Sequence, residues 1–577
     1  MKNYIIIFLF LFVGKFVFAQ EKPIVTKAKD TIKTEVINVV TSYTPKVTDA
    51  FKIKKKPTIK LSDKSQKKKL TYQIFPAPVA STFTPKKGTF KGVDFGDREK
   101  LYDNYVAVGF GNNTTPYLET FIHYSTRFQN DFGIYAKYIS SDDPVENTTL
   151  NSSFSEIIAN LYYKQEDRYF DWRVGFDVEK KDYNWYGLPN INFTPTVLNN
   201  IDESQTYNYL NVHGKISFED SYINFGKVAI SYFTDAWNSN EYRATLNPQF
   251  QFPLQSLGAN FNDITLDVSL DYLGGSFAQS YENTNDINYS FFTAGIKPVY
   301  KFNIHKFKVK LGGKLYYSSD IENSISHFLA YPDVQVSYPI INNYATIYLG
   351  AGGDLHTNTY KQFSEENPFI SPTQFLTQTN EKYNFFGGFN GKLSQNISYN
   401  TRASYRKYED KALYSINNSK SDGTTSLYNG NAILGYEYGN SFSVIYDDVD
   451  NLHFFGEIEW DFNKNLVLGA NGEFNTYTPK QQQYAWNLPK LKSEIFAKYK
   501  THKWYACTNI FFQSQRIDVS YLSSFPGNST PIGIEKYFDV NINGGYLFND
   551  YFSVFLKVNN VFNHKYQRFS TYNVQGF

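Results

Sequence analysis

Apolar and polar residues alternate along the stretch 451–477. One side of the pattern carries Leu452, Phe454, Gly456, Ile458, Trp460 and Phe462, and the other carries His453, Phe455, Glu457, Glu459 and Asp461. After a polar turn at 463–465 the alternation resumes and continues to Tyr477. A period of two residues is that of a β-strand, because successive side chains point to opposite faces. The stretch therefore predicts a β-hairpin with one apolar face and one polar face.

The same alternation recurs from Tyr105 almost to the end of the chain. It predicts strands at 105–111, 117–126, 132–140, 155–166, 169–181, 205–219, 221–235, 240–252, 262–274, 287–302, 305–319, 325–337, 343–356, 381–394, 396–409, 442–462, 465–477, 490–501, 503–516, 535–548 and 550–561. The polar faces carry full charges, as in Lys308, Lys310 and Lys314. Such a face excludes a dry interior and needs a water-filled or plugged lumen.

The connections between these strands are alternately short and long. Turns such as 303–304 and 463–465 occupy every second connection, and loops such as 182–204 and 410–441 occupy most of the others. Short turns on one rim and long loops on the other are typical of an outer-membrane β-barrel, whereas a soluble β-sandwich has no reason to segregate loop length. The pattern predicts an all-β fold, a transmembrane antiparallel β-barrel formed by residues 105–577.

Lipid provides the reason for closing the sheet. Every backbone N–H and C=O in hydrocarbon must pair internally, and an open sheet edge leaves a row of them unpaired. Single-chain bacterial barrels favour even strand numbers, so we expect about 22 strands. Residues 568–576 do not alternate, so we expect the last strand to be truncated or unusually short and its seam with the first strand to be weak.

The N-terminal part of the chain differs from the rest. Residues 1–19 read as a secretory signal peptide, with Lys2, an apolar run and Ala19 before the cleavage point. Residues 20–104 are rich in lysine and proline, with nine lysines between 52 and 69, and predict a mostly irregular basic linker. No apolar run long enough for a membrane helix follows Ala19. We expect export to the outer membrane of a Gram-negative cell.

Composition narrows the function classes. The formal net charge is +2, so no general attraction to nucleic acid is expected. The single cysteine, Cys507, excludes an intrachain disulfide framework. Tyrosine and phenylalanine are abundant, with 49 and 52 copies. The tryptophans predict two aromatic belts, with Trp172, Trp460 and Trp504 near the short-turn rim and Trp185, Trp237 and Trp486 near the other.

Motifs of catalysis are absent from the sequence: it contains no HExxH, Walker loop or CxxC, and no GxSxG in a strand–turn–helix setting. We therefore expect no enzyme activity, no catalytic residue, no metal site and no cofactor. Asp447, Asp448 and Asp450 form an acidic rim group, either solvated or binding calcium. Aromatic residues in the long loops are candidates for stacking on a sugar or siderophore, or for loop packing; they are Tyr183, Trp185, Tyr186, Tyr484 and Trp486.

Four stretches resemble a known family. KVNNVFNHKYQ (557–567) is similar to the N-L-F-x-x-x-Y run before the last strand of TonB-dependent receptors, in the branch found in Bacteroidota. EVINVVTSYTPKV (35–47) is similar to the segment that opens the plug of that family and engages TonB. PVASTFTPKKGTFKGV (78–93) and YDDVDNL (446–452) also resemble a receptor subgroup. The resemblance implies a transport barrel.

The resemblance also implies partners. The candidate TonB contact is Val36, Ile37, Asn38, Val39, Val40 and Thr41. The other expected partners are outer-membrane lipid and, during biogenesis, the barrel-assembly machinery, with no nucleic acid. The chain departs from the family in its plug, since residues 20–104 are shorter than a family plug and lack its Gly-rich pattern. The plug is therefore expected to be reduced or absent.

Two functions remain open from the sequence. The first is uptake of a bulky nutrient, such as a siderophore or glycan, across the outer membrane. The second is a plugless passive pore or a barrel component of an outer-membrane complex.

Overall fold

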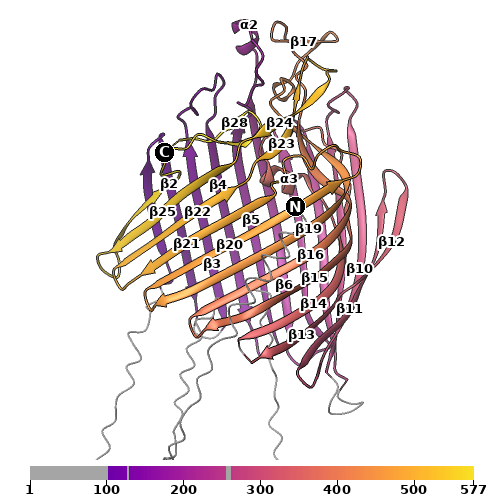
Figure 1. Ribbon diagram of the computed structural model, residues 1–577, viewed down its shortest axis with the longest axis vertical. Helices are drawn as coiled ribbons and strands as arrows, with labels where there is room; N and C mark the ends of the chain where they lie inside the picture. Colours follow the sequence, from indigo (N-terminus) through magenta and orange to yellow (C-terminus); the bar gives the residue numbers. More distant parts are fainter. Residues whose placement is uncertain (1–101, 127–128, 255–261, 343, 577) are drawn as a thin grey trace, which may run out of the picture. The chain divides into compact units, whose positions relative to one another are not determined.

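A 22-stranded antiparallel sheet, curved into a barrel, dominates the computed structural model (Figure 1). The structure describes residues 102–126, 129–254, 262–342 and 344–576. The strands of the sheet are β1 (Tyr105–Gly111), β2 (Thr115–Ser125), β3 (Asn130–Ser141), β4 (Phe154–Glu166), β5 (Phe170–Asn184), β6 (Ser204–Phe218), β7 (Ile223–Asp235), β8 (Asn240–Phe252), β9 (Ile264–Phe277), β10 (Ile287–Ile304), β11 (Phe307–Asp320), β12 (Ile325–Pro332), β13 (Val334–Ile341), β14 (Ala345–His356), β15 (Thr379–Ser394), β16 (Ile397–Ile416), β19 (Phe442–Asn463), β20 (Leu466–Pro479), β21 (Leu491–Lys500), β22 (Trp504–Gln513), β25 (Tyr537–Leu547) and β26 (Ser553–Val558). The predicted antiparallel β-barrel fold is confirmed.

Strands β12 and β13 form one span of the barrel, interrupted at Asp333. Both pair with β11, β12 through Gly313–Asp320 and β13 through Lys308–Lys310. At the break, the Asp333 N–H donates to the carbonyl of Gly312 at 3.0 Å. The 22 strands therefore make 21 spans, which match the 21 stretches of alternation in the sequence.

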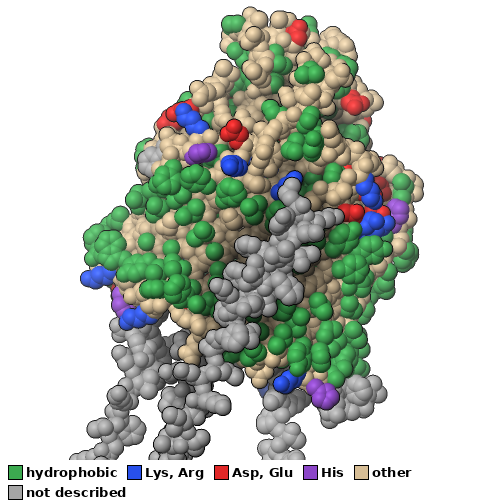
Figure 2. Space-filling model, in the orientation of Figure 1, with side chains coloured by type: hydrophobic (Ala, Val, Ile, Leu, Met, Phe, Trp, Pro, Cys, Tyr) green, Lys and Arg blue, Asp and Glu red, His purple; other side chains and the backbone are tan. Residues whose placement is uncertain are grey.

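The barrel wall has an apolar exterior. On β19, Leu452, Phe454 and Ile458 point outward and are exposed, while Glu457 and Glu459 on the alternate face are partly buried. Figure 2 shows hydrophobic side chains spread over the wall, with the visible charged side chains gathered near the two rims. Such a band of apolar side chains suits contact with lipid. Within the described ranges, no helix has the length and hydrophobicity needed to cross a bilayer.

The seam between β26 and β1 lacks a backbone ladder within the described residues. Side chains on the lumen side meet across it instead. Lys557 Nζ donates to the Tyr117 hydroxyl at 3.0 Å, and the Phe555 ring lies edge-on to Tyr117 with centroids 6.0 Å apart. A side chain at Gly109 would press on Phe555. This arrangement agrees with the expected weak seam.

The long connections gather at one end of the barrel, the loop end, and fold together there (Figure 1). They contain the short elements α2 (Pro195–Leu198), α3 (Tyr360–Glu366), η2 (Gly435–Glu437), β17 (Leu427–Tyr428), β18 (Asn431–Ala432), β23 (Arg516–Tyr521), β24 (Ser529–Ile534), β27 (Gln567–Phe569) and β28 (Tyr572–Asn573). Their aromatic side chains form a buried core that includes Trp185, Tyr360, Phe363, Phe442 and Tyr572. The opposite end, the turn end, carries short turns such as 464–465.

Several expectations fall on residues that the structure does not describe. The signal peptide (1–19), nearly all of the basic linker (20–104) and the TonB contact Val36–Thr41 lie outside the described residues.

The tryptophans confirm only part of the belt prediction. Trp460 and Trp504 are exposed at the turn end, where β19 ends and β22 begins. The prediction for the loop end is wrong for Trp185 and Trp486, which are buried in the aromatic core of the loops. Long loops that pack on one another provide an apolar environment that the alternation of strands does not reveal.

Candidate functional site

The connection between β14 and β15, residues 357–378, forms a roof over part of the lumen. Helix α3 lies in its first half, capped by the Thr359 hydroxyl, which accepts from the Gln362 N–H at 3.0 Å. The roof contributes to two hollows. One end lines a cavity inside the barrel and the other lines a pocket among the loops.

The first half of the roof is anchored by buried carboxylates. The Tyr360 hydroxyl donates to Asp235 Oδ2 at 2.8 Å. The Tyr360 and Lys361 N–H groups donate to the two carboxylate oxygens of Glu241, at 2.6 and 3.2 Å. Burial and the Asp235 carboxylate hold the pKa of Tyr360 well above its usual value, so the phenol stays protonated and keeps donating. The ring of Tyr360 is fully buried.

The second half of the roof is hydrogen-bonded to β19. The Phe442 N–H donates to the Phe369 carbonyl at 3.0 Å, and the Ser371 N–H donates to the Phe442 carbonyl at 2.8 Å. The Gln374 side chain accepts from the Val444 N–H at 2.7 Å and donates to the Ser371 carbonyl at 2.8 Å. The backbone of the roof is thereby fixed at both ends.

The inner cavity, about 570 Å³, lies between the first half of the roof and the lumen wall from β8 to β16. Its wall carries side chains of both positive and negative charge. Arg243 binds Asp271 in a bidentate pair at 2.8 and 2.7 Å, and Asp354, whose Oδ2 lies 2.7 Å from Lys314 Nζ, also lines the cavity. Lys411 has no carboxylate within ion-pair distance among the described residues, and its ammonium lies 4.5 Å from the centroid of a tyrosine ring. The cavity is a charged compartment with room for water.

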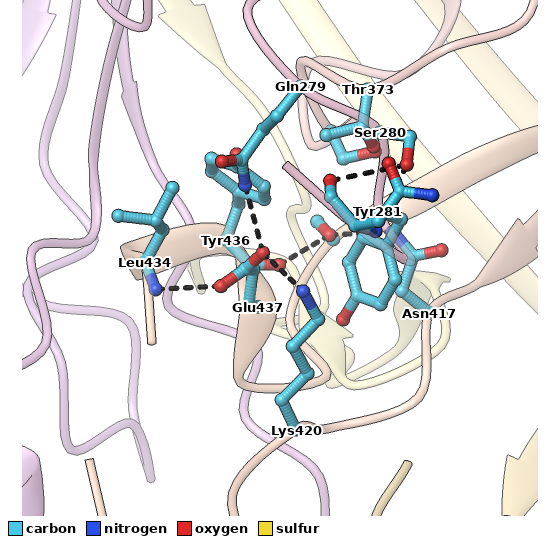
Figure 3. Close-up of polar contacts among 12 residues, drawn as sticks. Gln279, Ser280, Tyr281, Thr373, Asn417, Lys420, Leu434, Tyr436 and Glu437 are labelled. Carbon is cyan, nitrogen blue, oxygen red and sulfur yellow. Dashed lines mark hydrogen bonds and ion pairs between the residues drawn. The ribbon is translucent and has the colours of Figure 1, made fainter. Parts of the chain in front are cut away.

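The outer pocket, about 640 Å³, is built from four connections at the loop end. These are the β9–β10, β14–β15, β16–β19 and β22–β25 connections. Its walls are amide, hydroxyl and aromatic side chains, including Asn418, Phe375 and Tyr281. Behind Tyr281 lies a buried ion pair, Lys420 Nζ to Glu437 Oε1 at 2.6 Å (Figure 3).

The predicted loop aromatics lie beside this pocket but do not line it. Trp185 packs edge-on to a buried tyrosine at 5.5 Å, and the Tyr186 hydroxyl donates to the Asn573 carbonyl at 2.8 Å. Tyr183 packs against the aromatic core, as does Tyr484, whose ring meets Trp486 at 5.4 Å. They hold the loops together; contact with a ligand stays a prediction.

The three acids of the predicted rim differ in their contacts. Asp447 is buried and accepts the N–H groups of residues 481 and 482, and Asp448 pairs with Lys480 at 3.1 Å. Asp450 Oδ1 is buried and has no hydrogen-bond partner in the part of the chain that the structure describes. Among the residues that the structure describes, no group of three or more His, Cys, Asp or Glu side chains is arranged to hold a metal ion.

Sequence reasoning missed the residues that shape both hollows. The Thr359–Gln362 spacing is a recognisable helix start and was the one local signal for the roof helix. Lys420 and Phe375 lie in irregular loops and Glu437 ends the short helix η2, and no periodicity predicts their partners.

The fold is that of solved outer-membrane receptors. The pyoverdine outer membrane receptor FpvA from Pseudomonas aeruginosa PAO1 matches with a TM-score of 0.59 at 13% identity, over 83% of this chain and 78% of that chain. The siderophore receptor PirA from Acinetobacter baumannii matches with 0.58 at 11%, over 82% and 78%. The FrpB iron transporter from Neisseria meningitidis (F3-3 variant) matches with 0.60 at 9%, over 81% and 79%. At these identities the likeness shows a shared fold. No protein-family model and no curated protein matches the sequence.

Proposed function

We propose that this protein is an outer-membrane transport barrel that takes up a bulky nutrient, with its loop end facing the outside of the cell. The roof carries this proposal, because a single connection lines both the outer pocket and the inner cavity. A ligand held in the pocket and a path through the lumen would be separated by one structural element. Release of the roof's anchors at Glu241, Asp235 and β19 would let the roof move and join the two hollows.

Two further observations support the proposal. The fold is shared with receptors named for siderophores and iron. The sequence resembles TonB-dependent receptors at 557–567 and at 35–47. In this proposal the exterior of the barrel contacts outer-membrane lipid, the barrel-assembly machinery inserts it, and Val36–Thr41 contacts TonB.

The proposal is tested by deleting the gene and measuring growth on single nutrients, together with site-specific crosslinking of residues 35–47 to TonB. Loss of growth on one nutrient and a crosslink to TonB are expected. A large, steady single-channel current from the purified full-length chain, without a crosslink, would contradict the proposal and favour a passive pore.

A further inference from the structure

The outer pocket presents no cation to a ligand. Among the described residues that line it, none is Lys, Arg or His, whereas two exposed acids, Glu282 and Asp286, lie on its rim. An anionic ligand entering the pocket would meet like charge with no compensating partner. The lining therefore disfavours carboxylate-rich or catecholate ferric chelates.

The cation beside the pocket is neutralised and covered. Lys420 pairs with Glu437 at 2.6 Å, and both side chains are buried. Glu437 also accepts from Gln279 Nε2 at 3.1 Å and from the Leu434 N–H at 2.9 Å (Figure 3). The ring of Tyr281 lies 5.1 Å from the Lys420 ammonium and itself lines the pocket. The positive charge is therefore held behind an aromatic wall.

One aromatic ring on the pocket wall is exposed. Phe375 is 66% exposed, although the neighbouring residues 371–374 and 376 are buried. The roof backbone that carries it is stapled to β19 through Ser371 and Gln374. A rigidly presented ring loses little conformational entropy on binding and offers an apolar platform for a flat ligand face.

One buried donor in the pocket lacks an acceptor. Asn418 is 5% exposed, lines the pocket, and its Nδ2 group has no hydrogen-bond partner among the described residues. An unsatisfied buried amide is costly. The Nδ2 atom itself is covered, so a ligand oxygen would reach it, and relieve that cost, when the Asn418 side chain turns toward the pocket. Three exposed amides, Asn283, Asn285 and Asn288, add donors and acceptors on the rim.

We propose that the outer pocket binds a neutral oligosaccharide, with one sugar ring stacked on Phe375 and a hydroxyl accepting from Asn418 Nδ2. Sugars match this lining because their hydroxyls both donate and accept, as amides do, and one face of the ring is apolar. The pocket volume falls within the range of about 300–1,000 Å³ that is usual for small-ligand sites. This assignment rests on the proposed function, because it names the substrate class of the uptake barrel.

The test is calorimetric titration of the purified full-length protein with four neutral probes: maltoheptaose, laminarihexaose, mannohexaose and chitohexaose. At least one is expected to bind, and Phe375→Ala is expected to weaken it about tenfold. Asn418→Ala is expected to weaken it several-fold; its side-chain Nδ2 has no partner to lose, so the fold should persist. Phe328→Ala, which removes an exposed ring on β12 outside the pocket, is the matched control and should bind normally.

Three outcomes would overturn the assignment. One is no binding of any of the four sugars at millimolar concentration. Another is binding that Phe375→Ala and Asn418→Ala leave unchanged. The third is Phe375-dependent binding of ferric enterobactin, polygalacturonate or a tryptic peptide pool in place of the neutral sugars. Binding without uptake or TonB crosslinking would instead reject the proposed transport function and leave the sugar site standing.

Discussion

The roof lines both the outer pocket and the inner cavity, but the two hollows differ in the charged side chains that line them. Among the described residues, no Lys, Arg or His lines the pocket, and the Lys420–Glu437 pair beside it is buried in the loops. The cavity is lined by the cationic side chains of Arg243, Lys297 and Lys411. In the proposed function, this difference separates two tasks. Neutral amides and a ring suit selective binding, while charged, hydrated walls suit passage.

Solvation explains why the buried ions of the loop end are paired, whereas the wall of the cavity carries more exposed ions. Ions buried among loops are stable only when they are paired and hydrogen-bonded, because desolvation is costly. Ion pairs on a hydrated wall are screened and contribute little. Charge should therefore control stability at the loop end and have much less effect on stability in the cavity.

Breaking the buried pair should have the largest effect. Lys420→Met leaves the Glu437 carboxylate buried without its cation, which should cost about 3–5 kcal/mol of local stability. Hydrogen exchange of residues 417–441 measures this cost. In the double variant Lys420→Met/Glu437→Gln both charges are gone, and most of the stability should return. Unchanged hydrogen exchange in Lys420→Met would show that the ion pair contributes little to the stability of the loops.

Asp518, on the β23–β24 hairpin, should give the loop end a pH dependence. Burial raises the pKa of Asp518 to about 6, although Asn487, two backbone N–H groups and Arg516 act in the opposite direction. The folded loop therefore holds this proton more tightly than the unfolded chain, whose carboxyl titrates near about 3.9. The stabilisation is complete below about pH 4 and is lost as the pH rises through about 6, a change of about 3 kcal/mol.

Hydrogen exchange of residues 516–534 between pH 4 and pH 8, corrected for the intrinsic exchange rate, checks this prediction. Asp518→Asn should remove the dependence, because an amide does not titrate. A profile that is flat in the parent protein, or unchanged in the variant, would assign the proton elsewhere.

Loss of the hydrogen bond that anchors the roof should have the next largest effect on stability. Tyr360→Phe removes the hydroxyl that donates to Asp235, and a hydrogen bond to a carboxylate contributes about 2 kcal/mol. Exchange in the roof, residues 357–378, should rise accordingly. Tyr551→Phe at the turn end, where the side chain is 94% exposed, is the control. Equal exchange in both variants would mean that the roof is held by its other contacts alone.

A charge change in the cavity should have the smallest effect on stability. Arg243 is about one-third exposed, so Arg243→Met should change stability by less than about 1 kcal/mol because the lumen screens the pair. Thermal unfolding followed by circular dichroism measures it. A loss as large as that of Lys420→Met would erase the contrast between the two regions.

The sequence predicted the wall well because the wall obeys a local rule. Alternation placed Ile458 outside and Glu457 inside, and the β19–β20 hairpin pairs Ile458 with Ala470, as its two faces require. The break at Asp333 escaped prediction, because an interruption of one span depends on how its neighbour β11 pairs.

The loop end escaped prediction for a different reason. Trp185 and Trp486 were placed at a lipid interface, but tertiary packing among loops buries them. The Lys420–Glu437 pair and the exposed Phe375 depend on contacts between irregular segments, and neither period nor motif reports such contacts. The sequence therefore located the long loops that build the outer pocket but not the residues that line it.

The length of β19 has a mechanical consequence. The strand has 22 residues, about 73 Å at 3.3 Å per residue, whereas a tilted span needs only about 9–11 residues. Roughly half of β19 therefore extends beyond the bilayer, and the roof is hydrogen-bonded to the outer tip of the strand at Phe442. A small tilt of the wall at membrane level would move the tip of β19, and with it the roof that carries Phe375, farther than it moves the wall itself.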